Sequence, residues 1–388
     1  MRLIKTPVTL LKMKAYRRLC NYATTAVKQE IQYQIPKAAR VEKNNPGDHD
    51  NHDVSKFYTI DPKTVSNIFH TGGLPKPFTE QTKMFAETAV MIRKPALEVI
   101  NSLKSTDFQK PAVRYLLYGQ TGSGKSISLA HILHYAYSSK FILYHIPYVP
   151  IWLKYDRKEV NWSSSKNGMA DIPLIAAQWL KHFMHQNRAL LDELNLTTSQ
   201  DYVWSQRETT PKGTTLNELI AHGINRAKYA CDCMDILLNE LKTHCSNNRC
   251  KMLVAIDGFN AFYNEKTDLK TEDRVNVTPQ QITMVQTGLS AVLSDWNNGA
   301  IVMVTSPRAA LNTRRESHLP IYLIGRQGFE HIDPFIPVMV PELSTAEFNN
   351  MLDYYEEKRW LQKTGGRKEL EFLTSKLPAE LMARCAPL

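Results

Sequence analysis

Short apolar runs that end at polar or turn residues divide the chain into predicted strands. The first run, Arg114–Tyr118, stops abruptly at Gly119, and a helix is predicted to follow from about Lys125. Four later runs have the same buried character and are predicted as strands: Phe141–Ile146, Met252–Ile256, Ile301–Thr305 and Phe335–Val340. A strand, a loop, a helix and a second strand in this order are typical of a parallel α/β sheet, whose crossovers are right-handed.

Helical periodicity fills most of the sequence between these runs. Helices are predicted over Thr79–Asn101 with an interruption at Pro95, and over Pro173–Asn187, Leu216–Lys242, Thr278–Trp296, Thr345–Trp360 and Arg367–Leu377. Within Leu216–Lys242, apolar residues recur at alternating three- and four-residue steps, so we expect one face of a single helix. Because the segment from about residue 150 to 250 is helical and polar, a helical insertion between core strands is predicted.

Composition indicates an ordinary globular protein with a substantial core. The chain has 388 residues, of which 43% are hydrophobic and 22% charged, and it is long enough for one main domain with appendages. Apolar runs stay well below the roughly 18 residues that span a bilayer, so no transmembrane segment is expected. Six cysteines in a chain of this length favour free thiols in a reducing compartment over a disulfide framework.

Much of the positive charge lies at the start of the chain. No acidic residue precedes Glu30, whereas the first 29 residues contain seven cations: Arg2, Lys5, Lys12, Lys14, Arg17, Arg18 and Lys28. Without them the net charge of +10 falls to +3, so total charge no longer argues strongly for a nucleic-acid partner, and DNA binding is not expected. This acid-free, amphipathic stretch is predicted to be a mitochondrial transit peptide; the alternative is a basic surface tail.

Two groups of residues raise the alternative of a metal site. The polar stretch Asn44–Asp53 is predicted to be a solvated linker, although its side chains include potential ligands: Asp48, His49, Asp50, His52 and Asp53. The second group consists of Cys231, Cys233, Cys245 and Cys250. On a helix Cys231 and Cys233 point about 200° apart, so packing in the core is the preferred interpretation.

One motif carries specific chemistry. The segment Gly119-Gln120-Thr121-Gly122-Ser123-Gly124-Lys125-Ser126 matches the phosphate-binding loop pattern G-x-x-x-x-G-K-[ST] and lies between a predicted strand and a predicted helix. Glycines permit positive φ and close approach of the backbone, so that successive N–H groups point at phosphate oxygens, and the helix N-terminus adds positive potential. The predicted nucleotide-binding residues are Gly119, Gln120, Thr121, Gly122, Ser123, Gly124, Lys125, Ser126 and Ile127.

A nucleotide at this loop requires Mg²⁺ and a second ligand for it. Lys125 is expected to reach the β- and γ-phosphates, and the Ser126 hydroxyl to ligate Mg²⁺. The run Leu253–Ile256 is followed by Asp257, which resembles the acidic strand end that completes such metal sites. Ser126 and Asp257 are therefore the predicted metal ligands, although 131 residues separate them in the chain.

The sequence offers less evidence for hydrolysis of a nucleotide than for its binding. Many ATPases of the AAA+ type carry a Glu after this Asp to activate water, whereas Gly258 stands here, so slow or absent hydrolysis is expected and no catalytic residue is assigned. Ser306 and Arg308 follow a predicted strand and are candidates for contact with the γ-phosphate, with a plain polar strand end as the alternative. The motif that reads guanine in small GTPases, N-K-x-D, is missing from the sequence, so motifs do not decide the base.

A dispersed set of further segments resembles a known family, the mitochondrial small-ribosomal-subunit GTP-binding proteins, also called death-associated proteins. The resemblance runs from about Phe78 to Leu388. It rests on Tyr115–Gly119, His145–Pro147, Tyr202–Trp204, Leu253–Gly258, Gly299–Val302, Asp333–Pro337 and Trp360–Gln362. It implies an AAA+-like P-loop fold in the mitochondrial matrix, GTP or GDP (with ATP as the alternative) and Mg²⁺ as cofactors, and small-subunit rRNA and ribosomal proteins as partners.

With the resemblance included, four segments are expected. They are residues 1–29, the transit peptide; 30–77, an N-terminal extension or linker; 78–341, the P-loop domain; and 342–388, a C-terminal helical region. The favoured hypothesis is a structural ribosomal protein that holds its nucleotide. The alternative is an active AAA+-like NTPase or a regulatory switch that acts in ribosome assembly or apoptosis signalling. Three basic pairs are candidates for contact with RNA phosphates, with an ordinary solvated charged face as the alternative: Arg314–Arg315, Lys358–Arg359 and Arg367–Lys368.

Overall fold

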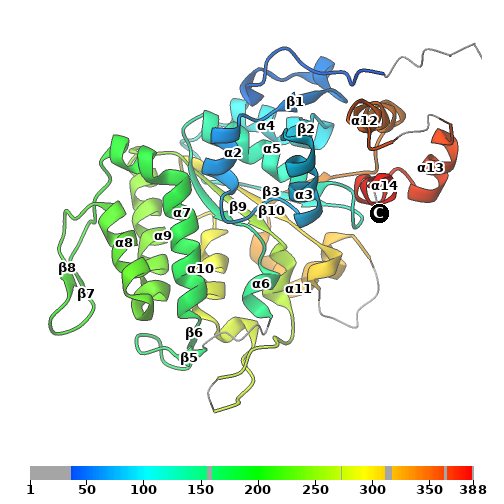
Figure 1. The fold of residues 1–388 in the computed structure, drawn as a ribbon. Helices are drawn as coiled ribbons and strands as arrows, with labels where there is room; N and C mark the ends of the chain where they lie inside the picture. The colour runs from blue at the N-terminus through cyan, green and yellow to red at the C-terminus, as the bar shows by residue number, and fades with distance from the viewer. Residues whose placement is uncertain (1–35, 155–159, 272, 311–316, 362–364, 387–388) are drawn as a thin grey trace, which may run out of the picture. The chain divides into compact units, whose positions relative to one another are not determined.

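The computed structural model describes residues 36–154, 160–271, 273–310, 317–361 and 365–386 (Figure 1). The chain divides into two compact units, residues 1–37 and 38–388, and every contact discussed below lies within the second. The predicted transit peptide and the basic pair Arg314–Arg315 lie outside the described residues. Within the described residues, no helix is long and apolar enough to cross a membrane.

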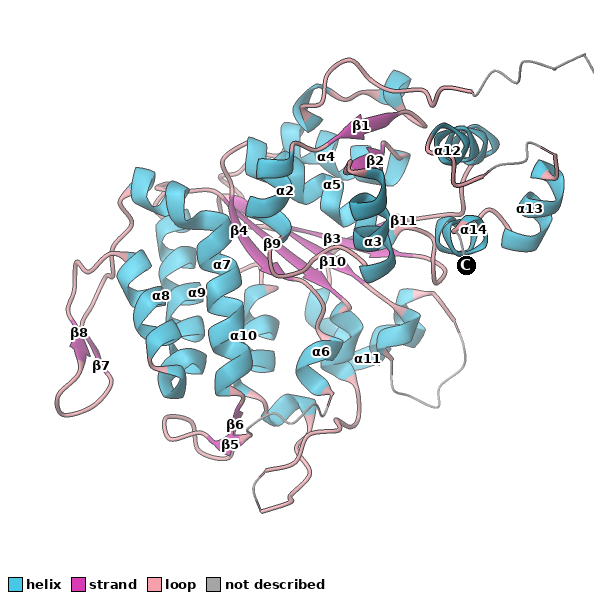
Figure 2. Ribbon diagram, in the orientation of Figure 1, coloured by secondary structure: helices cyan, strands magenta, loops and turns pink. Residues whose placement is uncertain are grey.

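A five-stranded parallel sheet forms the centre of the fold (Figure 2). In spatial order its strands are β11 (Ile336–Met339), β3 (Val113–Tyr118), β10 (Gly299–Val304), β9 (Met252–Asp257) and β4 (Ile142–Ile146). Val304 pairs with Leu117 on one side and Asp257 on the other, so the carboxyl ends of three strands meet at one edge. All five predicted strands are confirmed, with ends displaced by one or two residues, and so is the α/β class.

Helices cover both faces of the sheet because successive side chains of a strand point to opposite faces. Tyr115 and Leu117 pack into a core with α2 (Pro62–Phe69), α4 (Lys94–Ser105) and α5 (Lys125–Ser138). Leu116, between them, packs into a second core on the other face. That second core includes α7 (Pro173–Leu194), α8 (Leu216–Asn225), α9 (Ala230–Ser246), α10 (Thr283–Ala291) and α11 (Pro320–Ile332).

The single helix predicted over Leu216–Lys242 is wrong. The chain leaves α8 at Arg226, passes through a short 3₁₀ turn and starts α9 at Ala230. Helix α8 packs against both α7 and α9, which requires the chain to reverse between them. The apolar spacing continued through the break because both helices bury a face in the same core. The helix expected over Thr278–Trp296 is shorter as well, since α10 covers only Thr283–Ala291.

The helix predicted over Thr79–Asn101 is also wrong. Helix α3 (Lys76–Phe85) ends at Ala86, which has a left-handed φ of 50°, and the strand β2 (Ala89–Met91) follows before α4. This strand pairs with β1 (Phe57–Thr59), an interaction that local periodicity does not contain. Pro95 lies in the first turn of α4, where its missing N–H costs little.

Residues near both ends of the second unit share a third core. Phe57 and Met91 pack with Phe348 and Leu381 from the C-terminal helices. Those helices are α12 (Thr345–Glu357), α13 (Arg367–Thr374) and α14 (Pro378–Cys385), the last of which was not predicted. Other short elements include α6 (Pro150–Leu153), β5 (Asn161–Trp162), β6 (Ala170–Asp171), β7 (Tyr202–Val203) and β8 (Thr209–Thr210).

Neither predicted metal alternative is present among the described residues, where no group of three or more His, Cys, Asp or Glu side chains has a suitable arrangement. The stretch Asn44–Asp53 is largely exposed, as expected of a linker, but His49 is buried and its Nδ1 lies 3.0 Å from Nε2 of His131. The five described cysteines are free and buried, in agreement with packing in the core.

Candidate nucleotide-binding site

The loop from Gly119 to Ser126 connects β3 to the first turn of α5. A Cβ atom on Gly119 would lie 2.3 Å from the carbonyl oxygen of Val340, so only glycine fits beside β11. Gly124 has a φ of 95° at the helix start, a conformation that residues with a Cβ rarely adopt. The first N–H groups of α5, including that of Ile127, face outward from the helix end, as at every helix N-terminus.

Lys125 is buried and folds back onto its own loop. Its Nζ donates hydrogen bonds to the carbonyl oxygens of Gly119 (2.8 Å) and Gln120 (2.6 Å), and the side chain is only 7% exposed. Burial lowers the pKa of Lys125 to about 8; the negative charge of Asp257 opposes this effect, and the positive charge of Arg308 adds to it. The ammonium group is therefore held near the loop, and the charge of Asp257 compensates its own charge only in part.

Ser126 and Asp257 meet across the sheet edge. The Ser126 hydroxyl donates a hydrogen bond of 2.5 Å to Oδ2 of Asp257, which is 6% exposed. Burial raises the pKa of Asp257 to about 6, although hydrogen bonds from Ser126 and the backbone of Gly258 and the charge of Lys125 all favour the carboxylate. A buried carboxylate beside a hydroxyl fits a divalent cation, because Mg²⁺ prefers oxygen ligands and would supply the missing positive charge.

Gly258 follows Asp257 at a place that leaves no room for a larger side chain. Its φ of 72° favours glycine, and a Cβ there would lie 2.7 Å from Cδ of Pro150 and 3.2 Å from the ring of Tyr148. A glutamate therefore does not fit at this position. Nearby, Asn260 exchanges hydrogen bonds with the backbone of Ser306, which fixes the end of β10.

Two contacts of the loop were not predicted. Arg93 is buried, and its guanidinium donates hydrogen bonds to the carbonyl oxygens of Ser123 (2.6 Å), Pro341 (2.9 Å) and Glu342 (3.0 Å) and to Oε1 of Glu347 (3.2 Å). At the start of α14, the N–H of Ala379 donates to the carbonyl oxygen of Gly122 at 3.2 Å. The loop is thus bound directly to the C-terminal helices, and no spacing in the sequence signals either contact.

One cation of each described basic pair predicted to contact RNA is engaged within the chain, whereas Arg359 and Lys368 are exposed. Lys358 forms an ion pair with Glu87 at 2.5 Å, and Arg367 pairs with Asp353 (2.7 Å) and Glu356 (2.8 Å). Carboxylates that already neutralise these cations reduce their attraction for phosphate. Lys358 and Arg367 therefore support the packing of the C-terminal helices, and contact with RNA phosphates stays a prediction for Arg359 and Lys368.

The raised pKa of Asp257 leads to a prediction for the nucleotide-free protein. Between pH 3.8 and about 6 the folded state binds this proton more tightly than the unfolded state, so its contribution to stability falls as pH rises. Asp257→Asn removes the contribution. As pH rises from 4 to 7, the free energy of unfolding of the variant is expected to increase relative to that of wild type, by at most about 3 kcal/mol.

Chemical denaturation of both proteins in EDTA, at pH 4 and at pH 7, measures this change in relative stability. Asp273→Asn, at an exposed loop position, is the matched control and is expected to show no such gain. A difference between wild type and Asp257→Asn that does not change with pH would contradict the inferred burial of the charge.

Fold and site together define an α/β protein with a parallel sheet whose glycine-rich loop, lysine, serine and aspartate converge at the carboxyl ends of the strands. The family model described as mitochondrial ribosomal death-associated protein 3 matches residues 90–384. The chain belongs to this family.

Known relatives agree with this assignment. The chain is 38% identical over 355 residues to the Bos taurus protein named small ribosomal subunit protein mS29, covering 90% of this chain and 88% of the relative. It is 37% identical to the Mus musculus protein of the same name, with 90% of each covered. A chain of the solved E. coli MS115-1 HORMA:CdnC:Trip13 complex aligns over 82% of this chain and 79% of its own, at 11% identity and a TM-score of 0.29, which is too low to support a conclusion.

Proposed function

We propose that this protein is a structural component of the small subunit of the mitochondrial ribosome and that it holds a purine nucleotide with Mg²⁺ at the Gly119–Ser126 loop. Membership of a mitochondrial ribosomal family, and relatives named as small ribosomal subunit proteins, support the first part. The protein accordingly acts in the mitochondrial matrix, with small-subunit rRNA and neighbouring ribosomal proteins as its partners.

The arrangement of Lys125, Ser126 and Asp257 is the observation that carries the nucleotide proposal. Loop N–H groups and the helix N-terminus would bind phosphate oxygens, and Lys125 would neutralise the terminal phosphates. Ser126 and Asp257 would ligate Mg²⁺, which in turn would compensate the buried carboxylate. GTP or GDP is the proposed nucleotide because of the family resemblance, since none of the contacts described above reads a base.

Little or no turnover is proposed, and the nucleotide's role is architectural. The position after Asp257 lacks a general base and has no room for one, because Pro150 and Tyr148 occupy that space. The loop is bonded to the C-terminal helices through Arg93 and Ala379, so a bound nucleotide would stabilise the junction between these parts of the chain. A ligand that binds only the folded form stabilises that form by mass action.

Release of phosphate from GTP and ATP distinguishes this role from an active NTPase. With Mg²⁺ and purified protein, we expect less than about one turnover per minute, well below the median turnover rates of enzymes. Turnover of several per minute that disappears in Lys125→Ala would contradict the architectural role. A regulatory switch instead predicts abundant protein away from the ribosome, so sedimentation of mitochondrial extract tests it: co-migration with small subunits is the expected result.

A further inference from the structure

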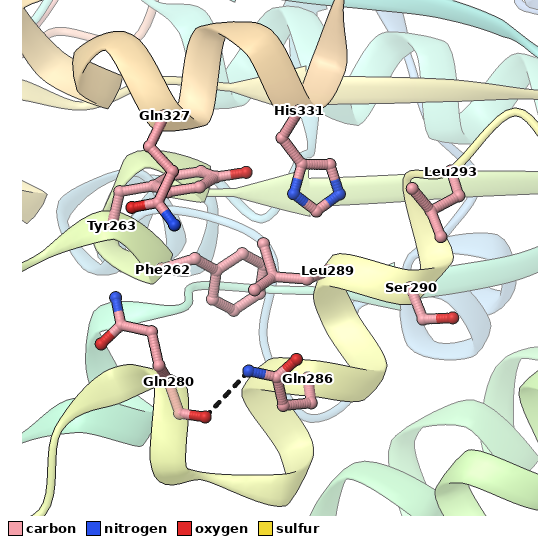
Figure 3. A pocket seen from close by; sticks show the side chains of 9 residues that line it. All are labelled: Phe262, Tyr263, Gln280, Gln286, Leu289, Ser290, Leu293, Gln327 and His331. Carbon is pink, nitrogen blue, oxygen red and sulfur yellow. Dashed lines mark hydrogen bonds between the residues drawn. The ribbon is translucent and has the colours of Figure 1, made fainter.

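A pocket of about 320 Å³ lies away from the Gly119–Ser126 loop and shares no residue with it (Figure 3). It opens between α10, α11 and the 3₁₀ turn Phe259–Tyr263, which follows β9. Figure 3 shows Gln327 and His331 reaching in from α11, opposite Gln280 and Gln286. Its lining consists of Phe262, Tyr263, Gln280, Gln286, Leu289, Ser290, Leu293, Gln327 and His331.

Two aromatic rings form the inner wall because two helices present glycine to them. A Cβ on Gly288 of α10 would lie 2.6 Å from Cζ of Phe262, and a Cβ on Gly328 of α11 would lie 3.0 Å from the ring of Tyr263. Each ring therefore lies directly against a helix backbone. Phe262 is fully buried, whereas Tyr263 is partly exposed, so the Tyr263 ring offers the surface on which a flat ligand can stack.

Polar atoms in this wall have no partner within the described part of the chain. The Tyr263 hydroxyl and Nε2 of His331 are buried and make no hydrogen bond to any described residue. Their rings are in an edge-to-face arrangement, with centroids 6.3 Å apart. Most buried polar groups in proteins are hydrogen-bonded, so two such atoms at the same pocket indicate where a ligand's donors and acceptors belong.

The lining carries no full charge at neutral pH. It contains three glutamine amides and a serine but no Asp, Glu, Lys or Arg. Burial lowers the pKa of His331, with a further effect from Arg114, while a hydrogen bond with the backbone of Leu289 opposes the shift. A phosphate or carboxylate would find no cation among these side chains. Gln286 donates to the carbonyl oxygen of Gln280 at 2.8 Å, which orients its amide.

We propose that this pocket binds an uncharged, planar group with hydrogen-bond donors and acceptors along its edge, of the class of a nucleobase. Glutamine amides pair with base edges through a donor and an acceptor side by side, and aromatic rings stack on base faces. The volume suits a ligand of nucleoside size. A free nucleoside and an unstacked base of an RNA loop share this chemistry, and the inference does not depend on a nucleotide at the Gly119–Ser126 loop.

Equilibrium dialysis of the full chain against adenosine, guanosine, cytidine and uridine tests the proposal, with short single-stranded oligonucleotides as a second arm. At least one nucleoside is expected to bind. Tyr263→Phe and Gln327→Ala should each weaken that binding by about fivefold or more, as expected for the loss of one hydrogen bond. Gln109→Ala, at an exposed position, should leave it unchanged.

The nucleoside and oligonucleotide measurements together distinguish a free nucleoside from an unstacked base of an RNA loop. Oligonucleotide binding that is tighter than nucleoside binding and sensitive to Tyr263→Phe identifies an RNA base, whereas binding of nucleosides alone identifies a free ligand. Absence of nucleoside binding at millimolar concentration would overturn the proposal. So would equal binding by wild type, Tyr263→Phe and Gln327→Ala.

Discussion

Lys125→Ala is expected to weaken the binding of GTP or GDP by about 100-fold or more, because it removes a charged hydrogen-bond donor from the phosphates. In the structure Nζ is buried against two loop carbonyl groups, so its charge is already confined to the place where phosphates would lie. Truncation keeps the glycines of the loop and removes the cation together with its two hydrogen bonds to the carbonyl oxygens of Gly119 and Gln120. The variant is therefore expected to fold and to lose its ligand.

Calorimetric titration with Mg²⁺ and nucleotide measures this change. The matched control is Lys140→Ala, which removes an exposed lysine that forms a surface ion pair with Glu193. Wild type and the control should also gain thermal stability on addition of nucleotide, and Lys125→Ala should not. An unchanged nucleotide affinity in Lys125→Ala would show that the loop is not part of the nucleotide-binding site.

Arg93→Ala is expected to lower the free energy of unfolding by about 3–5 kcal/mol, the range found when one partner of a buried ion pair is removed. Arg93 and Glu347 have side chains only 7% and 6% exposed. Without the guanidinium, the carboxylate of Glu347 and the carbonyl oxygens of Ser123, Pro341 and Glu342 lose a donor. The loss should also loosen the contact between the loop and the C-terminal helices.

Urea denaturation tests this expectation against two comparisons. Arg326→Ala breaks an ion pair to Glu330 in which the arginine side chain is 91% exposed, and it should cost no more than about 1 kcal/mol. Adding Glu347→Gln to Arg93→Ala should restore part of the lost stability, because it removes the unpaired charge and keeps an acceptor for the N–H of Ser344. Equal effects of Arg93→Ala and Arg326→Ala would show that the buried network contributes nothing beyond a surface pair.

The sheet could be predicted from sequence because each of its strands is a short, continuous apolar run. Strands buried on both faces carry that signal locally, as β9 does from Met252 to Ile256. The strand β2 gave no such signal, since three apolar residues within a helical pattern become a strand only by pairing with β1. The break between α8 and α9 was hidden for the opposite reason: both helices bury a face in the same core, so the periodicity continued.

The loop and Asp257 were likewise visible in the sequence, because each has a distinctive local composition. Their proximity was expected because a metal site at such a loop needs a carboxylate beside the serine, and the structure brings Ser126 and Asp257 together. Arg93 was not visible. It meets Glu347 across 254 residues, and an arginine before a helix has no pattern that identifies its partner. Contacts of this kind depend on tertiary packing alone.

Nucleotide content of native mitochondrial small subunits tests the central claim most directly. Particles purified in Mg²⁺ and then denatured should release about one purine nucleotide per copy of this protein, guanine by the family resemblance, and particles carrying Lys125→Ala should lack it. Wild-type particles that contain this protein and release no nucleotide, or release the same amount when Lys125 is replaced, would contradict the claim.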